Sequence, residues 1–328
     1  VFEMAQTKGQ SEAHPILSPN DEFAGFEQFP NLISLGVPAT IDSASFYRQG
    51  LAVGMKLEQK LGHNPYKMGA VAGADVLSGD QGTEEWDWKG AHGAQDDTPK
   101  KRLDPKPNAA GEPGFIVSSA GTTAVWAEEN TREGIFNGML SKETYGTSGT
   151  LIRLRFFGGW DLPAGLTADK HFVKKAYAAG VPMGQDLPPH PAKNLDKSPS
   201  FAVWAMKDPE SGNLDRVQII KVWSHPAHGF PMEKIYNVAW SDTDQRKPDA
   251  ETGKLPPVGN TVNIKEATYT NDIGDSQLSA VWTDPDFDPT HSAAYYVRVR
   301  EIPTPRWSTF DAKKLGVEPP KEVSPTTV

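Results

Sequence analysis

The sequence has no cysteine, no long apolar run and no excess of positive charge, and each absence removes a class of protein. Without cysteine there are no disulfides, no sulfur-ligated zinc sites and no cysteine nucleophiles. No apolar run approaches the roughly 20 residues of a membrane span, so we expect no transmembrane segment. With 33 Lys and Arg against 42 Asp and Glu, the net charge of −9 argues against nucleic acid as a partner.

The composition that is present predicts an ordered, loop-rich globular protein. Glycine (30) and proline (28) are abundant, and nine tryptophans accompany them. The 328 residues are enough for two domains of ordinary size. Because Val1 is not a start methionine and the final "EVSPTTV" has no features of a packed end, we expect further residues at both ends of the natural chain.

The first part of the chain alternates between predicted strands and helices. The segment "VFEMA" at residues 1–5 is a short strand, and residues 68–73 form a second, apolar strand typical of a buried parallel sheet. Between them, apolar residues recur at three-to-four spacing over residues 42–61, which predicts a helix with Asp42 or Ser43 as its cap. This order of elements is that of an α/β unit.

A long loop and a second helix complete this part. Residues 80–114 are rich in Gly, Pro and charge, with only the tryptophans of "EEWDW" to anchor them or to stack on a ligand. The next helix is expected to begin near Asn130 or Thr131. Its predicted apolar face consists of Ile135, Phe136, Met139 and Leu140.

The second part of the chain reads as strands alone. Seven short runs rich in Val, Ile, Tyr and Trp follow residue 148, separated by Pro, Gly, Asp and Asn turns. The runs are "TLIRLRFFGGW", "FAVWAMKD", "RVQIIKVWSH", "EKIYNVAWSD", "NTVNIKEATYTN", "QLSAVWTD" and "AYYVRVREIP". They predict an antiparallel β-sandwich over residues 148–328, with residues 1–147 as a separate α/β domain.

Several segments together resemble one family. They include "KGQSEAHPILSPNDEFA", "LEQKLGHNPYKMGAVAGADVLSG", "VWAEENTREGIF", "ETYGTSGTLIRLRFFGGWD" and "WTDPDFDP". The chain resembles the C-terminal half of a bacterial family of unknown function allied to the PHP (polymerase and histidinol phosphatase) superfamily of metal-dependent phosphoesterases. The resemblance implies that residues 1–147 are the C-terminal part of a PHP-type distorted (β/α) barrel, followed by the β-sandwich domain.

The resemblance also implies a metal site. Glu3 matches the metal-bridging acid of the family, and Asp75 stands where members read Asp-x-His. Leu77 occupies the histidine position of that motif, and a leucine cannot ligate a metal. The family's His-x-His motif is missing, and the nearest pair of histidines is His225 and His228. Glu3 and Asp75 would suit Mn, Fe, Zn or Mg as surviving ligands, or they cap turns.

Other polar residues are weaker candidates. His14 could act as an acid or base, ligate a metal, or only hydrogen-bond its loop. Lys8 and Glu12 are candidate substrate contacts. Asp284, Asp286 and Asp288 alternate in "TDPDFDP" and form either a calcium site or, by preference, a turn.

Two functions follow from this reading. The first is a PHP-like hydrolase in which a metal-activated water attacks a phosphoester, impaired by Leu77 and acting on a small-molecule ester. The second is a non-catalytic pseudoenzyme that binds a ligand or protein partner through the β-sandwich and the 80–114 loop. For either one we expect a periplasmic or secreted protein, with homo-oligomerisation left open.

Overall fold

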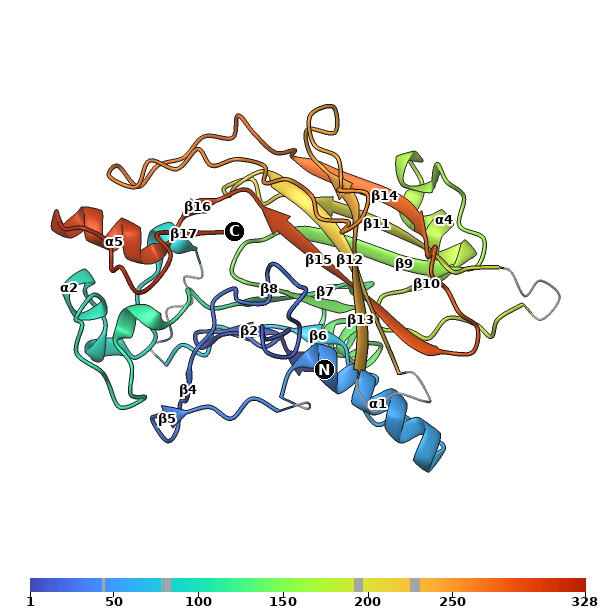
Figure 1. Ribbon diagram of the computed structural model, residues 1–328, viewed down its shortest axis with the longest axis horizontal. Coiled ribbons are helices and arrows are strands. Elements are labelled where there is room, and N and C mark those ends of the chain that lie inside the picture. The colour runs from blue at the N-terminus through green and yellow to red at the C-terminus, as the bar shows by residue number, and fades with distance from the viewer. Residues whose placement is uncertain (43–44, 78, 80–83, 192–196, 225–230) are drawn as a thin grey trace.

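Two antiparallel sheets form the main body of the protein. The computed structural model describes residues 1–42, 45–77, 79, 84–191, 197–224 and 231–328 (Figure 1). The four-stranded sheet has the order β10-β9-β11-β14, and the three-stranded sheet has the order β13-β12-β15. Their bounds are β9 Arg153–Gly159, β10 Val181–Pro182, β11 Ser200–Met206, β12 Leu214–Ser224, β13 Pro231–Trp240, β14 Gln277–Thr283 and β15 Ser292–Glu301.

The two sheets share one apolar core. Phe156 of β9, Val203 of β11 and Ile219 of β12 are all buried in it. Alternate residues of each strand face inward, as the period of two in the sequence predicts. Six of the seven predicted runs are strands, whereas the run at 260–271 contains only an isolated bridge between Asn263 and Thr268.

The prediction of a (β/α) barrel in residues 1–147 is wrong. In the described part of this region the strands are short and no barrel closes. They are β1 Phe2–Glu3, β2 Ala5–Gln6, β3 Gly9–Gln10, β4 Asn31–Leu32, β5 Val37–Pro38, β6 Ala70–Val71, β7 Thr122–Val125 and β8 Thr144–Thr147. Of their pairings only β1 with β6 is parallel; β2 with β3 and β4 with β5 form antiparallel hairpins, and β7 pairs antiparallel with β8 across α3 (Arg132–Leu140). A barrel of this type needs successive parallel strands joined by helical crossovers, which these short and mostly antiparallel segments cannot supply.

Helix α1 (Tyr47–Leu61) confirms the predicted helix and joins the two parts of the chain. It ends at Gly62, whose left-handed backbone (φ 77°) lets its N–H donate to the Glu58 carbonyl oxygen. Its start differs from expectation, since Phe46 is the N-cap residue and no side chain caps the helix; Ser43 lies outside the described residues. Met55 packs with Ile220 on the outer face of β12. The domain boundary at residue 147 stays a prediction.

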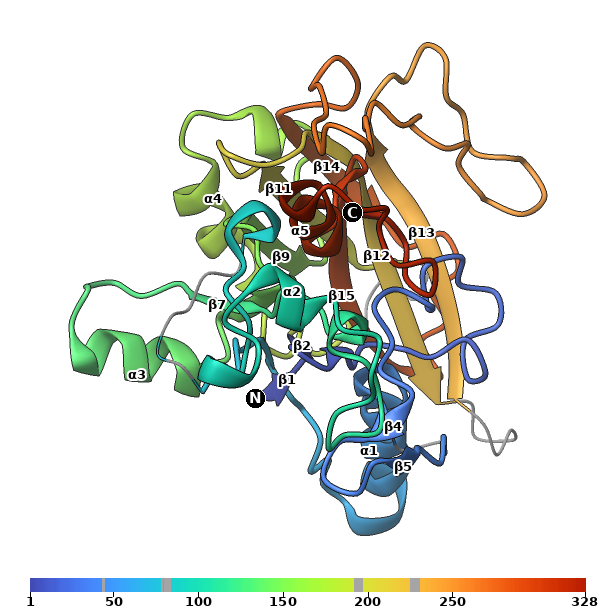
Figure 2. The same ribbon diagram turned by 90° about the vertical axis from the view of Figure 1, so that its left-hand side faces the viewer.

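Helix α3 (Arg132–Leu140) begins as predicted but does not pack as predicted. Thr131 is its N-cap, and the Thr131 side chain accepts a hydrogen bond from the Gly134 N–H (3.1 Å). The four predicted apolar residues are exposed instead of buried; Phe136 is 62% and Leu140 is 70% exposed. The helix stands out from the body (Figure 2), so it forms where the periodicity predicts, and nothing in the described chain covers its apolar face.

The long segment over 80–114 is pinned to the C-terminal helix. It contains η1 (Glu85–Asp87), η2 (Gly93–Gln95) and α2 (Pro99–Arg102), and η3 (Gly114–Ile116) follows. Trp88 is buried against Trp307 of α5 (Trp307–Leu315), with ring centroids 4.3 Å apart, whereas Trp86 is exposed. Trp88 is therefore an anchor. The remaining elements are η4 (Leu166–Ala168), α4 (Phe172–Ala179), β16 (Thr304–Pro305) and β17 (Thr326–Thr327).

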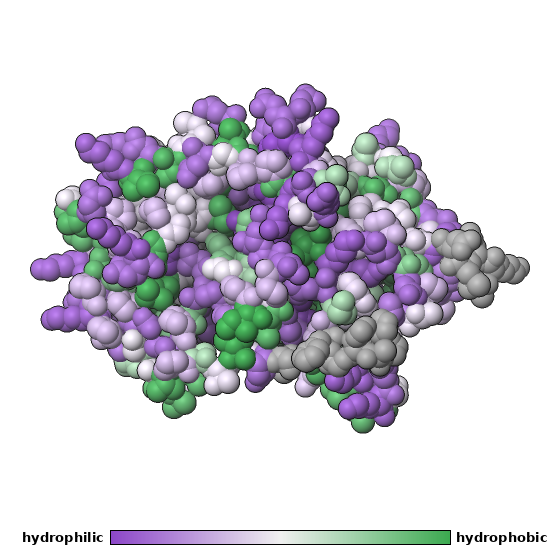
Figure 3. Space-filling model, in the orientation of Figure 1, coloured by the Kyte–Doolittle hydropathy of each residue, from purple (hydrophilic) through white to green (hydrophobic). Residues whose placement is uncertain are grey.

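The surface is mainly hydrophilic. On the face shown in Figure 3, hydrophobic residues form small separate groups among polar ones, which is ordinary for a protein surface. None of the described helices combines the length and apolar character of a membrane span.

Candidate functional site

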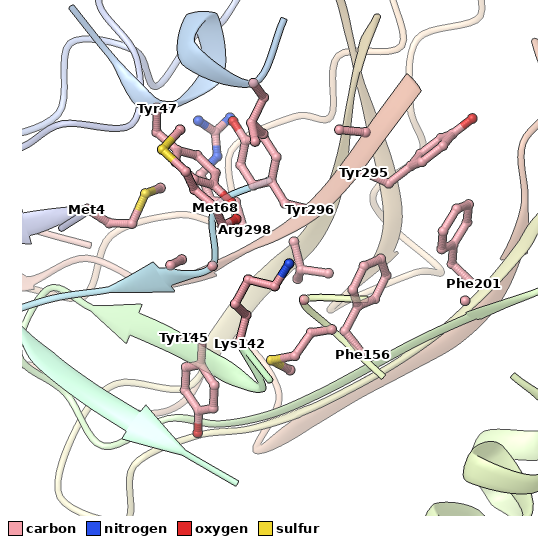
Figure 4. Close-up of a pocket in the computed structure, with 18 of the residues that line it drawn as sticks. Met4, Tyr47, Met68, Lys142, Tyr145, Phe156, Phe201, Tyr295, Tyr296 and Arg298 are labelled. Atoms are coloured by element: carbon pink, nitrogen blue, oxygen red, sulfur yellow. Dashed lines mark hydrogen bonds between the residues drawn. The ribbon is translucent and has the colours of Figure 1, made fainter. Parts of the chain in front are cut away.

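A cavity of about 760 Å³ lies along strand β15 (Figure 4). All ten residues of β15 line it, from Ser292 to Glu301. Because successive side chains of a strand point to opposite faces, a cavity that touches every residue follows the edge of the strand. Its volume is in the range of sites that hold small ligands.

The edge of β15 that faces the cavity has no strand partner. The other edge pairs with β12 along the whole strand, from Ser292 with Ser224 to Glu301 with Leu214. In the described part of the chain no strand pairs with the cavity-facing edge. Backbone N–H and C=O groups on that edge are therefore available to an occupant of the cavity.

The walls of the cavity are aromatic, and their hydroxyl groups are already hydrogen-bonded. Tyr47 donates to the Met68 carbonyl oxygen (3.0 Å), and Tyr145 donates to the Ile152 carbonyl oxygen (2.9 Å). Phe201 packs on Tyr295 with ring centroids 4.4 Å apart. These walls offer an apolar surface and little competing polarity.

Lys142 points into the cavity with its amine directed toward the aromatic walls (Figure 4). Its backbone is left-handed (φ 62°), which is strained for a side chain other than glycine. Gly69 and Gly184 pack closely against Lys142. A Cβ at Gly69 would lie 2.7 Å from the Lys142 Cβ, and a Cβ at Gly184 would collide with the Lys142 carbonyl oxygen. The Lys142 Nζ donates to the Lys67 carbonyl oxygen (3.2 Å) and forms no ion pair with an acid of the described residues.

A buried ion network lies on the outer face of β15, and its members Glu12, Tyr296 and Arg298 also line the cavity. The Glu12 carboxylate accepts from Arg48 (2.6 Å), from the Tyr296 hydroxyl (2.7 Å) and from Arg298 (3.2 Å). Asp21 accepts from both Arg298 and Arg48, each at 2.8 Å. Burial acts to raise the pKa of Glu12, but the guanidinium groups of Arg298 and Arg48 outweigh it and hold that pKa below its usual value. Glu12 thus belongs to an ion network and also lines the cavity, and its predicted role as a substrate contact stays a prediction.

Arg300 and Glu301 close one end of the cavity with unmet hydrogen-bonding capacity. The buried Nε of Arg300 and the buried Oε1 of Glu301 have no hydrogen-bond partner among the described residues. The Arg300 guanidinium stacks on Phe23, 3.6 Å from the ring centroid. Burial and the neighbouring Arg298 lower the pKa of Arg300 to about 9, and burial raises the pKa of Glu301 to about 7.

The two predicted metal ligands lie at one edge of the parallel β1–β6 pair. Glu3 ends β1, Asp75 follows β6, and both are exposed. The Glu3 carboxylate lies against Gly73, since a Cβ there would be 2.8 Å from the Glu3 Oε1. Leu77 is 76% exposed and adds no ligand. Across the described ranges no group of three or more His, Cys, Asp or Glu side chains could hold a metal, so this site stays a prediction.

His14 and Lys8 lie outside the cavity. The His14 Nδ1 accepts from the Ile16 N–H (3.2 Å), and burial lowers the pKa of the imidazole. The Lys8 Nζ donates to the Ser11 hydroxyl (3.4 Å). The structure does not bring either one together with Glu12 or Asp75 in a common pocket. The histidine pair His225 and His228 lies outside the described residues.

The three aspartates predicted to bind calcium have separate partners. Asp284 is fully buried and pairs with Lys221 (2.7 Å) while accepting from the Tyr295 hydroxyl (2.7 Å). Asp286 pairs with Lys234 (2.5 Å), and Asp288 accepts from Thr290. A calcium ion would have to displace two lysines here, and the site stays a prediction.

Sequence reasoning missed Lys142 and the free edge of β15. The alternation of Tyr296, Arg298 and Arg300 with two valines does reveal a polar face of the strand. Nothing in the local pattern shows which edge of the strand is left without a partner. The only available signal for Lys142 was its place between a helix and a strand.

Comparison with known proteins places the chain in a family without giving it an activity. No curated protein matches the sequence, and no solved structure matches it. One family model, described as "Protein of unknown function (DUF3604)", covers residues 1–328. The chain therefore belongs to the DUF3604 family.

Proposed function

We propose that this chain is a ligand-binding unit that receives an amphipathic anionic ligand in the cavity along β15. The volume of about 760 Å³ and the aromatic walls suit the apolar body of such a ligand. The free backbone edge of β15 can meet its polar groups.

Lys142 is the observation that carries this proposal. A lysine ammonium that points into an aromatic cavity without an acid partner is poised to receive an anion. Its left-handed backbone, with Gly69 against its Cβ and Gly184 against its carbonyl oxygen, fixes where the side chain begins, and strain of this kind is concentrated at functional sites.

Titration with a naphthalene sulfonate dye, which joins an aromatic body to an anion, tests the proposal by fluorescence. Met4→Trp fills part of the cavity, because Met4 lines it; Met232→Trp is the matched control on β13, outside the cavity. We expect saturable binding to wild type that Met4→Trp weakens on the order of tenfold and Met232→Trp leaves unchanged. Equal binding by all three proteins, or no saturable binding, would contradict the proposal.

A second function, a PHP-like metal-dependent hydrolase, is favoured by the two carboxylates at the β1–β6 edge. Carboxyl ends of parallel strands meet at one edge of a sheet, and Glu3 and Asp75 both follow such ends. Exposed carboxylate oxygens suit Mn or Mg, which would activate a water for attack on a phosphoester. The described residues supply only these two donors, so the set is incomplete and we derive no catalytic step from it.

Calorimetric titration with Mn²⁺ tests this second function. Binding that is lost in the Glu3→Gln/Asp75→Asn double variant and retained in Asp186→Asn would support the metal site. Equal heats for the wild type and the double variant would refute it.

A further inference from the structure

The cavity follows the whole length of an extended strand. Ten residues of a strand span roughly 33 Å, and the cavity touches all ten residues of β15. A compact ligand would use only part of such a length. A strand edge without a partner pairs readily with another extended backbone, because its N–H and C=O groups alternate at the spacing of a peptide.

The sides of the cavity provide room for side chains on both faces of an added strand. Phe156, Phe201 and Tyr295 lie on the side of the shared core. Tyr47 and Tyr296 lie on the side of α1, where their rings are 5.5 Å apart. A peptide strand laid between these walls would direct alternate side chains toward each.

Two cations without an ion pair on the cavity wall favour an acidic occupant. Most ionic groups of the wall neutralise one another: Glu12 pairs with Arg298, and Lys67 pairs with Asp186 (2.6 Å). Lys142 and Arg300 form no ion pair with a carboxylate in the part of the chain that the structure describes. Glu58 and Glu301 also line the wall, so it carries no positive surplus, and Lys142 and Arg300 are the groups that can pair with carboxylates of an occupant.

We propose that the cavity binds an extended acidic peptide segment, which adds to the free edge of β15 as a new strand with its carboxylates near Lys142 and Arg300. This inference rests on the proposed ligand-binding function and names the class of ligand. Main-chain hydrogen bonds to β15 supply affinity, and the two cations select acidic over basic sequences.

Fluorescence anisotropy with labelled, capped octapeptides tests the inference on the intact chain. The probes are an alternating Val-Glu peptide and its Val-Lys counterpart. Two further Val-Glu peptides carry N-methyl groups on every valine or on every glutamate, and these groups block one backbone edge each. We expect the Val-Glu peptide to bind at least tenfold more tightly than Val-Lys, and one N-methyl isomer to lose binding while the other keeps it.

Lys142→Gln is the matching protein variant. It removes one charge while keeping most of the side chain, and Lys174→Gln on exposed α4 is the control. We expect Lys142→Gln to weaken Val-Glu binding on the order of tenfold, as for a lost charge-assisted hydrogen bond, with Lys174→Gln unchanged.

Three outcomes would overturn the inference. They are equal affinity for Val-Glu and Val-Lys, equal affinity for the two N-methyl isomers, and dye binding with no peptide binding. The last outcome leaves the cavity as a small-molecule site, so it refutes the peptide without refuting the ligand-binding function. If wild type binds neither the peptides nor the dye, both the peptide inference and the ligand-binding function are refuted.

Discussion

Replacing Glu12 by Gln tests whether the buried ion network holds the N-terminal segment onto β15. Gln keeps the size of the side chain but removes the charge that faces Arg48 and Arg298. Both arginines still form ion pairs with Asp21, and Arg48 still forms one with Glu233 at 3.3 Å. Removing one partner of a buried ion pair costs roughly 3 to 5 kcal/mol; because other acids remain, we expect about 3 kcal/mol.

Urea unfolding followed by tryptophan fluorescence measures this loss at pH 7. The control is Asp186→Asn, which removes the charge of an exposed pair with Lys67 and should cost less than about 1 kcal/mol. A loss in Glu12→Gln no larger than that of the control would refute the role of the network.

The same pair of proteins carries a pH signature. The folded protein lowers the pKa of Glu12 below its ordinary value of 4.5, so the stability that the charge contributes is fully present above pH 4.5. This contribution is lost as the pH falls through the lowered pKa. The difference in unfolding free energy between wild type and Glu12→Gln should therefore shrink below pH 4.5, and a constant difference would contradict the assignment.

Three further predictions concern buried positions. Ala120 is fully buried at φ 99°, so Ala120→Gly should relieve backbone strain and raise the free energy of unfolding by about 1 kcal/mol; a loss would contradict this. Burial raises the pKa of Glu85 to about 7, so the folded protein holds a proton on Glu85 that the unfolded chain releases at lower pH. The free energy of unfolding should therefore fall as pH rises from 5 to 8. Glu85→Gln should flatten this pH dependence, and an unchanged pH dependence would contradict the assignment to Glu85. Lys221→Met leaves the Asp284 carboxylate buried without its cation and should lower the free energy of unfolding in urea by about 3 kcal/mol or more. Adding Asp284→Asn to this variant should recover part of the loss. A double variant no more stable than Lys221→Met would contradict a charge effect.

Local elements could be predicted from the sequence because their signals are local. The spacing of Tyr47, Leu51 and Gly54 defines the buried face of α1, and Gly62 follows the end of the helix. Short runs rich in β-branched and aromatic residues identify β11, β12 and β15 in the same way. These patterns depend only on the periods of helix and strand.

The arrangement of the N-terminal part could not be predicted, because strand pairing is not written in the local pattern. The apolar run at 68–73 is typical of a buried parallel strand, and β6 does pair in parallel with β1. The prediction of a barrel was wrong because the strands pair over only two to four residues and, apart from β1 with β6, the pairs are antiparallel. Glu12 illustrates the same limit, since its arginine partners are 36 and 286 residues away in the chain.

Amide hydrogen exchange along β15 tests the central claim most directly. Strand β12 is paired on both edges, by β13 and by β15, so its amides should all be protected. Every second amide of β15 faces the cavity, and we predict that these exchange much faster than their neighbours and slow down when a ligand is bound. Uniform protection of β15 at the level of β12 in the free protein would contradict an open strand edge and, with it, the proposed binding site.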